Sequence, residues 1–182
     1  MASPRSCPAL LVAASALLGC TGAAKPADTP QASAVPAEAA SAPGPGVGQK
    51  APPFAVKGVD GTLLALPNGK ATILMFWATW SEPDKKELGK LQDVHLQLGP
   101  ARVAVLALSV DDEPNALPAF AKTHALTFPI GWDAGHRIAG LYRPWAEPTT
   151  YVIDRAGVIR FIHSGYHDGE ADVIAAEVAS LR

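Results

Sequence analysis

The chain has 182 residues, a length that fits one domain together with a tail. Its 15 basic and 17 acidic residues give a net charge of -2, which is too balanced for recruitment of nucleic acid by bulk electrostatics. Both cysteines, Cys7 and Cys20, lie near the N-terminus. Residues 21–182 therefore contain no disulfide, no cysteine metal ligand and no cysteine nucleophile.

The first residues have the pattern of a secretory signal. Arg5 precedes an apolar run over residues 8–19, which is shorter than the roughly 20 apolar residues that a membrane-spanning helix needs. The run ends in Leu17-Leu18-Gly19-Cys20, which resembles the lipobox of bacterial lipoproteins. This resemblance implies that residues 1–19 are a lipoprotein signal peptide and that Cys20 is lipidated. A plain secretory signal that leaves Cys20 free is the alternative.

Residues 20–47 are predicted to be a disordered tether. The segment is rich in Ala, Pro and Gly and has no aromatic residue, so it has little with which to offset the entropy of ordering. As a flexible coil, a segment of this length spans about 30 Å. The globular domain is predicted over residues 48–182.

The predicted elements of the domain follow an α/β order. A hairpin is predicted over residues 54–66, where Asp60-Gly61 separates two apolar stretches. Continuous apolar runs predict buried strands at 71–77, 102–109 and 149–153. A strand at 158–163, after a tight turn, would pair antiparallel with the strand before it.

Three helices are predicted between and after these strands. Apolar residues recur at helical spacing over 88–98, 117–124 and 173–181. Together with the strands, they predict an α/β sandwich with a mixed central sheet flanked by helices and with an added N-terminal β-hairpin.

The strand that ends at Trp77 runs directly into the start of a helix. The sequence Phe76-Trp77-Ala78-Thr79-Trp80-Ser81-Glu82-Pro83-Asp84-Lys85-Lys86-Glu87 is similar to the active-site turn of TlpA/ResA proteins. These are membrane-tethered, extracytoplasmic thiol-disulfide oxidoreductases of the redoxin (AhpC/TSA-like) type, with the pattern Trp-Ala-Thr-Trp-Cys-x-Pro-Cys-Lys-x-Glu. Further matches at 47–54, 128–129 and 147–154 extend the resemblance over residues 47–182. The resemblance implies a thioredoxin-like fold.

The sequence departs from that pattern at both cysteines. Ser81 stands at the position of the nucleophilic cysteine and Asp84 at that of the resolving cysteine. Thiol exchange needs one thiolate to attack a disulfide and a second thiol to resolve the product, so no catalytic residue is expected here. A thiol peroxidase reaction is excluded for the same reason. Ser81 is predicted instead to cap the following helix, with Asp84 at its positive end and Pro83 in its first turn.

The resemblance also implies a groove that binds an extended polypeptide. In the family, the residue matching Pro148 is a cis-proline that faces the active-site turn. Trp77 is predicted to lie in the core, whereas Trp80 and Trp145 are predicted to flank the groove. The predicted groove residues are Trp80, Ser81, Glu82, Pro83, Asp84, Trp145, Glu147, Pro148 and Thr149.

A metal site is the less favoured interpretation of this cleft. Asp84 and Glu147 would place two carboxylates together, an arrangement that can bind a cation. No pair of the five histidines has the spacing of a helical zinc motif, although His163 or His167 beside acidic residues stays open. No metal ion and no cofactor are expected.

The sequence therefore favours a redox-inactive thioredoxin-fold protein that is lipid-anchored in the bacterial cell envelope, on its periplasmic or extracytoplasmic face. It would bind or scaffold a protein or peptide partner and no nucleic acid. The alternative is an extracytoplasmic thiol-disulfide oxidoreductase or redoxin that works with a partner thiol, which requires a free Cys20. A second alternative is metal or small-ligand binding at the former active-site turn.

Overall fold

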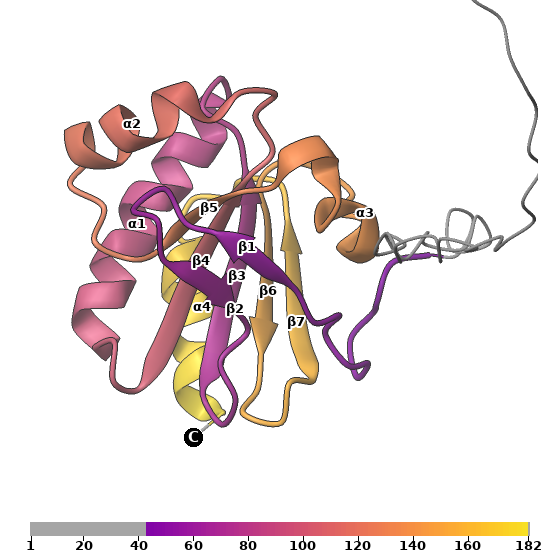
Figure 1. The fold of residues 1–182 in the computed structure, drawn as a ribbon. Coiled ribbons are helices and arrows are strands. Elements are labelled where there is room, and N and C mark those ends of the chain that lie inside the picture. Colours follow the sequence, from indigo (N-terminus) through magenta and orange to yellow (C-terminus); the bar gives the residue numbers. More distant parts are fainter. Residues whose placement is uncertain (1–42, 182) are drawn as a thin grey trace, which may run out of the picture. The chain divides into compact units, whose positions relative to one another are not determined.

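The computed structural model describes residues 43–181 (Figure 1). The predicted signal peptide, Cys20 and most of the predicted tether lie outside the described residues. Between residues 43 and 181, no helix combines the length and the apolar character needed to cross a membrane.

A mixed sheet of five strands forms the centre of the domain, in the order β5-β4-β3-β6-β7. Its parallel part joins β3 to β4 and β4 to β5, whereas β6 pairs antiparallel with both β3 and β7. The strands are β3 (Ala71–Trp77), β4 (Val103–Ser109), β5 (Ile130–Trp132), β6 (Thr149–Ile153) and β7 (Ile159–Ser164). The register pairs Phe76 with Thr149 and Trp77 with Ser109, so the ends of β3 and β4 meet the start of β6.

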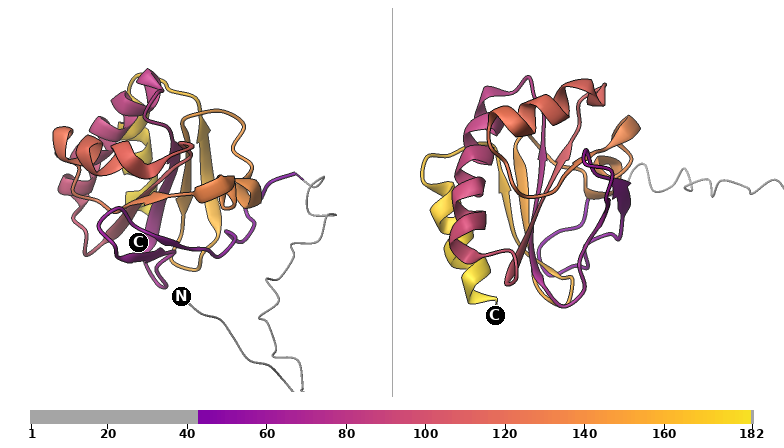
Figure 2. Two further views of the ribbon diagram at one scale, coloured as in Figure 1. Left: turned by 45° about the horizontal axis from the view of Figure 1, so that its top comes forward. Right: turned by 60° about the vertical axis from the view of Figure 1, so that its left-hand side comes forward.

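Helices cover both faces of this sheet (Figure 2). On one face, α1 (Glu82–Leu98) and α4 (Glu170–Ser180) lie side by side, with α2 (Leu117–Thr123) near the start of α1. The short helix α3 (Ala139–Tyr142) lies on the other face. Two short 3₁₀ turns, Pro114–Ala116 and Ala134–His136, precede α2 and α3.

The central strand β3 supplies both hydrophobic cores. Ile73, Met75 and Trp77 belong to the cluster that includes α1, α2 and α4 side chains. Leu74 and Phe76 belong to the cluster on the α3 face. Every residue of β3 is buried, as its continuous apolar sequence predicts.

The predicted N-terminal hairpin is present as β1 (Ala55–Lys57) and β2 (Leu63–Ala65), which pair antiparallel. It lies against β5, where Gly58 bridges Gly131. A Cβ atom on Gly131 would come within 2.8 Å of the Leu108 side chain and 3.0 Å of Val56, so only glycine allows this close approach.

The segment before the hairpin adds an edge beyond β7. The Gly48 amide donates to the carbonyl of Ile159 (2.8 Å), and the Ile159 amide donates to Gln49 (2.9 Å). The Ala51 amide donates to Gly157 (2.9 Å). The domain thus begins with backbone hydrogen bonds to its own last strand.

The predicted strands, hairpin and three helices are confirmed. The sequence did not predict β5 or α3, because elements of three or four residues are too short to show a period. The apolar periodicity misses the first turns of α1 and α4, which begin at Glu82 and Glu170, although the predicted cap at Ser81 gives the correct start of α1. Their first turns are acidic, and apolar periodicity alone misses such starts.

Candidate functional site

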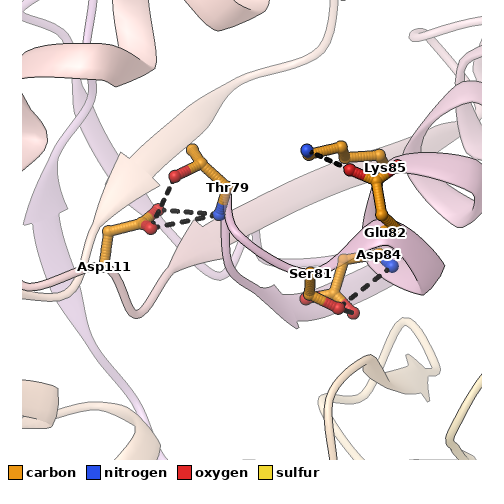
Figure 3. Close-up of polar contacts among 6 residues, drawn as sticks. All are labelled: Thr79, Ser81, Glu82, Asp84, Lys85 and Asp111. Carbon is orange, nitrogen blue, oxygen red and sulfur yellow. Dashed lines mark hydrogen bonds and ion pairs between the residues drawn. The ribbon is translucent and has the colours of Figure 1, made fainter.

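The turn between β3 and α1 is held by Ser81. The residue has extended backbone angles (φ -89°, ψ 114°), and its hydroxyl accepts a hydrogen bond from the Asp84 amide (3.4 Å). Pro83 lies in the first turn, where a missing N–H leaves no hydrogen bond unmade. These contacts confirm the predicted N-cap (Figure 3).

The Asp84 side chain turns inward and is wholly buried. Its Oδ2 accepts from the Ala78 amide (2.7 Å), and its Oδ1 accepts from the Ser81 hydroxyl (2.6 Å). Burial raises the pKa of Asp84, while the hydrogen bonds from Ser81 and Ala78 oppose that rise. The hydroxyl proton of Ser81 is therefore directed at an enclosed carboxylate rather than at solvent.

A second buried carboxylate, Asp111, fastens this turn to the end of β4 (Figure 3). Asp111 accepts from the Thr79 amide (3.1 Å), the Thr79 hydroxyl (2.7 Å) and the Ser109 hydroxyl (2.6 Å). Asp111 was not predicted as a site residue from the sequence. Its signal was available, because Asp111 lies just after the end of β4, the strand next to the one that leads into the turn.

The segment that faces the turn contains Glu147 and Pro148, joined by a cis peptide bond as the resemblance implies. Glu147 is half-buried, and burial raises its pKa. The carboxylates of Asp84 and Asp111 raise that pKa further, while His136 opposes the rise. The electrostatic effects of Asp84 and Asp111 thus reach the segment that contains Glu147.

The predicted groove residues differ in how far they are exposed to solvent. Trp80 and Trp145 are 70% and 89% exposed, the first on the turn before α1 and the second on the segment before Pro148. Thr149 is fully buried, and its hydroxyl donates to the carbonyl of Ala146. The Asp84 and Thr149 side chains are both enclosed by hydrogen bonds within the fold, and binding of a partner at the groove stays a prediction.

A further polar cluster lies between α1, β6 and α4. Glu87 is buried and accepts from the Thr150 hydroxyl (2.7 Å). Burial raises the pKa of Glu87 to about 7, against the opposing effect of the Thr150 hydrogen bond. The sequence signal that was missed is a charged residue next to Leu88, on the apolar side of α1.

His163 on β7 lies between two carboxylates of α4. Its Nδ1 is 3.0 Å from Glu170, and its Nε2 is 2.7 Å from Glu177. Both ring nitrogens are therefore used in fastening α4 to the sheet. Among residues 43–181, no three His, Cys, Asp or Glu side chains are arranged to hold a metal ion.

This architecture, a mixed sheet with a helix-capping turn opposite a cis-proline, defines a thioredoxin-like protein. The crystal structure of a protein assigned as thiol:disulfide interchange protein DsbE from Chlorobium tepidum matches it with a TM-score of 0.70. That match covers 75% of this chain and 98% of the other chain at 23% identity, and it shows the fold alone.

The sequence profile of the AhpC/TSA family matches residues 47–162, so the chain belongs to that family. The thiol-disulfide oxidoreductase ResA of Bacillus cereus is 32% identical over 115 residues, which are 62% of this chain and 66% of that protein. The thioredoxin-like protein YneN of Bacillus subtilis is 38% identical over 122 residues, 65% of this chain and 71% of that one. The chain thus spans about two-thirds of these relatives.

Proposed function

We propose that this chain is a redox-inactive member of its family, tethered to the cell envelope, which binds a polypeptide in the cleft between residues 78–84 and Glu147-Pro148. The observation that carries the proposal is the closed Ser81–Asp84 pair. At the two positions where the resembling family has cysteines, this chain has a helix cap and a buried carboxylate that bond each other.

The pair has no chemistry to offer a disulfide substrate. An exchange reaction begins with a thiolate, and an oxygen nucleophile forms no mixed disulfide. Ser81 is buried, and its hydroxyl already donates a hydrogen bond to the Asp84 carboxylate. Residues 21–182 contain no cysteine that could take over either role.

The cleft keeps features that suit a binding role. Trp80 and Trp145 offer exposed aromatic surface on its two borders, and aromatic side chains contribute strongly to protein interfaces. In the resembling family, the cis-proline segment lines the groove for an extended polypeptide, and Pro148 has the same isomer here. A protein or peptide partner therefore fits the cleft better than a small metabolite.

The envelope location is proposed from the N-terminal sequence. Leu17-Leu18-Gly19-Cys20 resembles a lipobox, and the oxidoreductase ResA to which the chain is similar belongs to the tethered, extracytoplasmic family described above. Lipidation of Cys20 would remove the last thiol of the mature chain. Residues 20–47 would then connect the anchor to the domain.

An insulin-disulfide reduction assay and a peroxide-consumption assay test the loss of redox chemistry. Both core clusters lie between Ala51 and Leu181, so a chain that starts at Thr21 keeps the whole core. We expect this chain to give rates equal to those of a no-protein control in both assays. Turnover above that control would overturn the proposal.

The double variant Ser81→Cys/Asp84→Cys provides the positive control. The extended N-cap position and Pro83 are retained, and a helix N-terminus lowers the pKa of a thiol placed there. We expect insulin reduction to rise clearly above background, with each single variant far weaker. A folded double variant without activity would mean that the cleft itself no longer accepts a disulfide substrate.

The alternative is an oxidoreductase that uses Cys20 with a partner thiol, and similarity to ResA favours it. Mass spectrometry of the mature N-terminus decides between the two. A diacylglyceryl group on Cys20 supports the tethered, inactive protein, whereas an unmodified thiol would support the alternative.

A further inference from the structure

The two ends of the central sheet carry opposite charge. At the end where the cleft lies, segments 78–85, 110–113 and 145–148 contain six carboxylates and one lysine. The opposite end is built from segments 67–71, 98–103, 154–158 and 178–181, which contain three basic residues and one acidic residue. We call this opposite end the basic end.

These four segments meet at the basic end, near the bottom of Figure 1. Ala71 pairs with Val103 at the start of β3 and β4, and the Lys70 ammonium donates to the carbonyl of Pro100 (2.9 Å). Lys50 from the N-terminal segment donates to Ala156 in the β6–β7 turn. The ammonium group of Lys50 thus adds a fourth positive charge to this end.

The one acidic residue of these segments, Asp154, has hydrogen-bond and ion-pair partners within its own turn and in β7. Asp154 accepts from the amides of Ala156 (2.8 Å) and Val158 (2.9 Å) and pairs with Arg160 (2.7 Å). Its oxygens are used by these groups, and no ion pair joins Asp154 to Arg102 or Arg155 among the described residues. Across residues 43–181, neither of these exposed guanidinium groups has a hydrogen bond or an ion pair.

Arg102 and Arg155 line one cavity of about 250 Å³. The rest of its lining is apolar and comes from Ala71, Leu98, Val103, Val178, Ala179 and Leu181. An occupant must therefore combine a negative group with a hydrocarbon part. Guanidinium groups match phosphate geometry well, and basic pockets flanked by apolar surface suit lipid head groups.

We propose that the basic end docks on anionic phospholipid, with a phosphate between Arg102 and Arg155 and the adjoining hydrocarbon against Leu98 and Val103. The acidic cleft would then face away from the bilayer and stay open to a partner. The inference rests on the proposed function to the extent that a lipid anchor keeps this end close to a membrane. The positive charge of Arg102 and Arg155 and the apolar lining of their cavity support the inference without that assumption.

Vesicle co-sedimentation with the non-lipidated chain from Thr21 tests this proposal separately from the anchor. We expect binding to vesicles that contain one-third phosphatidylglycerol, none to pure phosphatidylcholine, and release at about 0.5 M salt, where screening is short-ranged. Each basic residue at an anionic surface strengthens binding about five-fold, so Arg102→Gln/Arg155→Gln should weaken it about 25-fold.

The matched control is Lys57→Gln/Lys122→Gln, which removes the same charge from exposed positions on β1 and α2. It should retain nearly full binding, and circular dichroism verifies that both variants fold. Equal losses in the two variants, or equal binding to both vesicle types, would overturn the proposal.

Two further arms separate the competing occupants. Short-chain phosphatidylglycerol below its micelle concentration should bind with the same Arg dependence, and binding of inorganic phosphate alone with equal strength would refute a lipid site. Sedimentation velocity without vesicles tests head-to-tail pairing of the basic end with the acidic cleft of a second copy. Salt-sensitive dimers lost in the arginine variant, with no vesicle binding, would replace lipid by self-association.

Discussion

At the residue scale, the turn between β3 and α1 is held by hydrogen bonds among its own side chains and to Asp111. Ser81 both donates to and accepts from Asp84, and Asp111 holds Thr79 from the other side. Such contacts stabilise the start of α1, since buried donors without partners are costly. Packing and hydrogen bonding therefore maintain the conformation of this turn.

Asp111 provides a direct test of this interpretation. Asp111→Ala leaves the Thr79 amide and the Ser109 hydroxyl without their acceptor, and we expect it to lower the free energy of unfolding by about 2–3 kcal/mol. Asp111→Asn keeps one acceptor oxygen and should lose less. Urea denaturation measures both, and an alanine variant as stable as the parent chain would contradict the role assigned to Asp111.

The raised pKa of Glu87 leads us to expect that the free energy of unfolding depends on pH. Its pKa rises from 4.5 to about 7 on folding, mainly through burial. Between these values the folded state binds a proton that the unfolded state lacks, so stability falls as the pH rises from about 4.5 to about 7 and then levels off. Glu87→Gln should be near neutral at pH 5 and stabilising by up to about 3 kcal/mol at pH 8.

The Glu87 test requires comparison of the two chains across pH rather than a single profile. Burial lowers the pKa of His95, so its effect runs in the opposite sense and is present in both chains. Glu82→Gln is a suitable control, because Glu82 is exposed and its pKa is lowered by Lys85. A Glu87→Gln effect that does not change with pH would refute the burial argument.

At the element scale, the short segment 48–51 contributes more than its length suggests. Its backbone hydrogen bonds reach Ile159 and Gly157 and extend the sheet beyond β7. A chain that starts at Pro43 keeps these bonds, whereas one that starts at Pro52 loses all three. We expect the first to match the Thr21 chain in Tm and the second to unfold with about 2–3 kcal/mol less free energy. Equal Tm values for all three chains would contradict this.

The elements also show what the sequence could predict. The buried strands β3, β4 and β6 were predictable because their apolar runs are continuous, and Ser81 was predictable as a cap from residue type and spacing. β5 was not, because a strand of three residues is too short to show a period. The inward turn of Asp84 toward Ala78 was equally invisible, since spacing along a helix does not specify side-chain direction.

At the scale of the whole molecule, charge distribution carries information that net charge hides. A net charge of -2 excluded a strongly basic or acidic protein, yet the two ends of the sheet differ in sign. The pattern emerges only when segments distant in sequence meet, as 67–71 and 98–103 do at Lys70 and Pro100. The cleft and the basic end would consequently favour different partners.

The different exposure of the tryptophans makes intrinsic fluorescence a probe of ligand binding and of folding. Trp80 and Trp145 stand in solvent beside the cleft, whereas Trp77 is fully buried in the core. Indole emission shifts to shorter wavelength when water is removed from the ring. A ligand that covers Trp80 or Trp145 would thus shift the emission of the unlabelled protein to shorter wavelength. The emission of Trp77 would continue to report whether the core is folded.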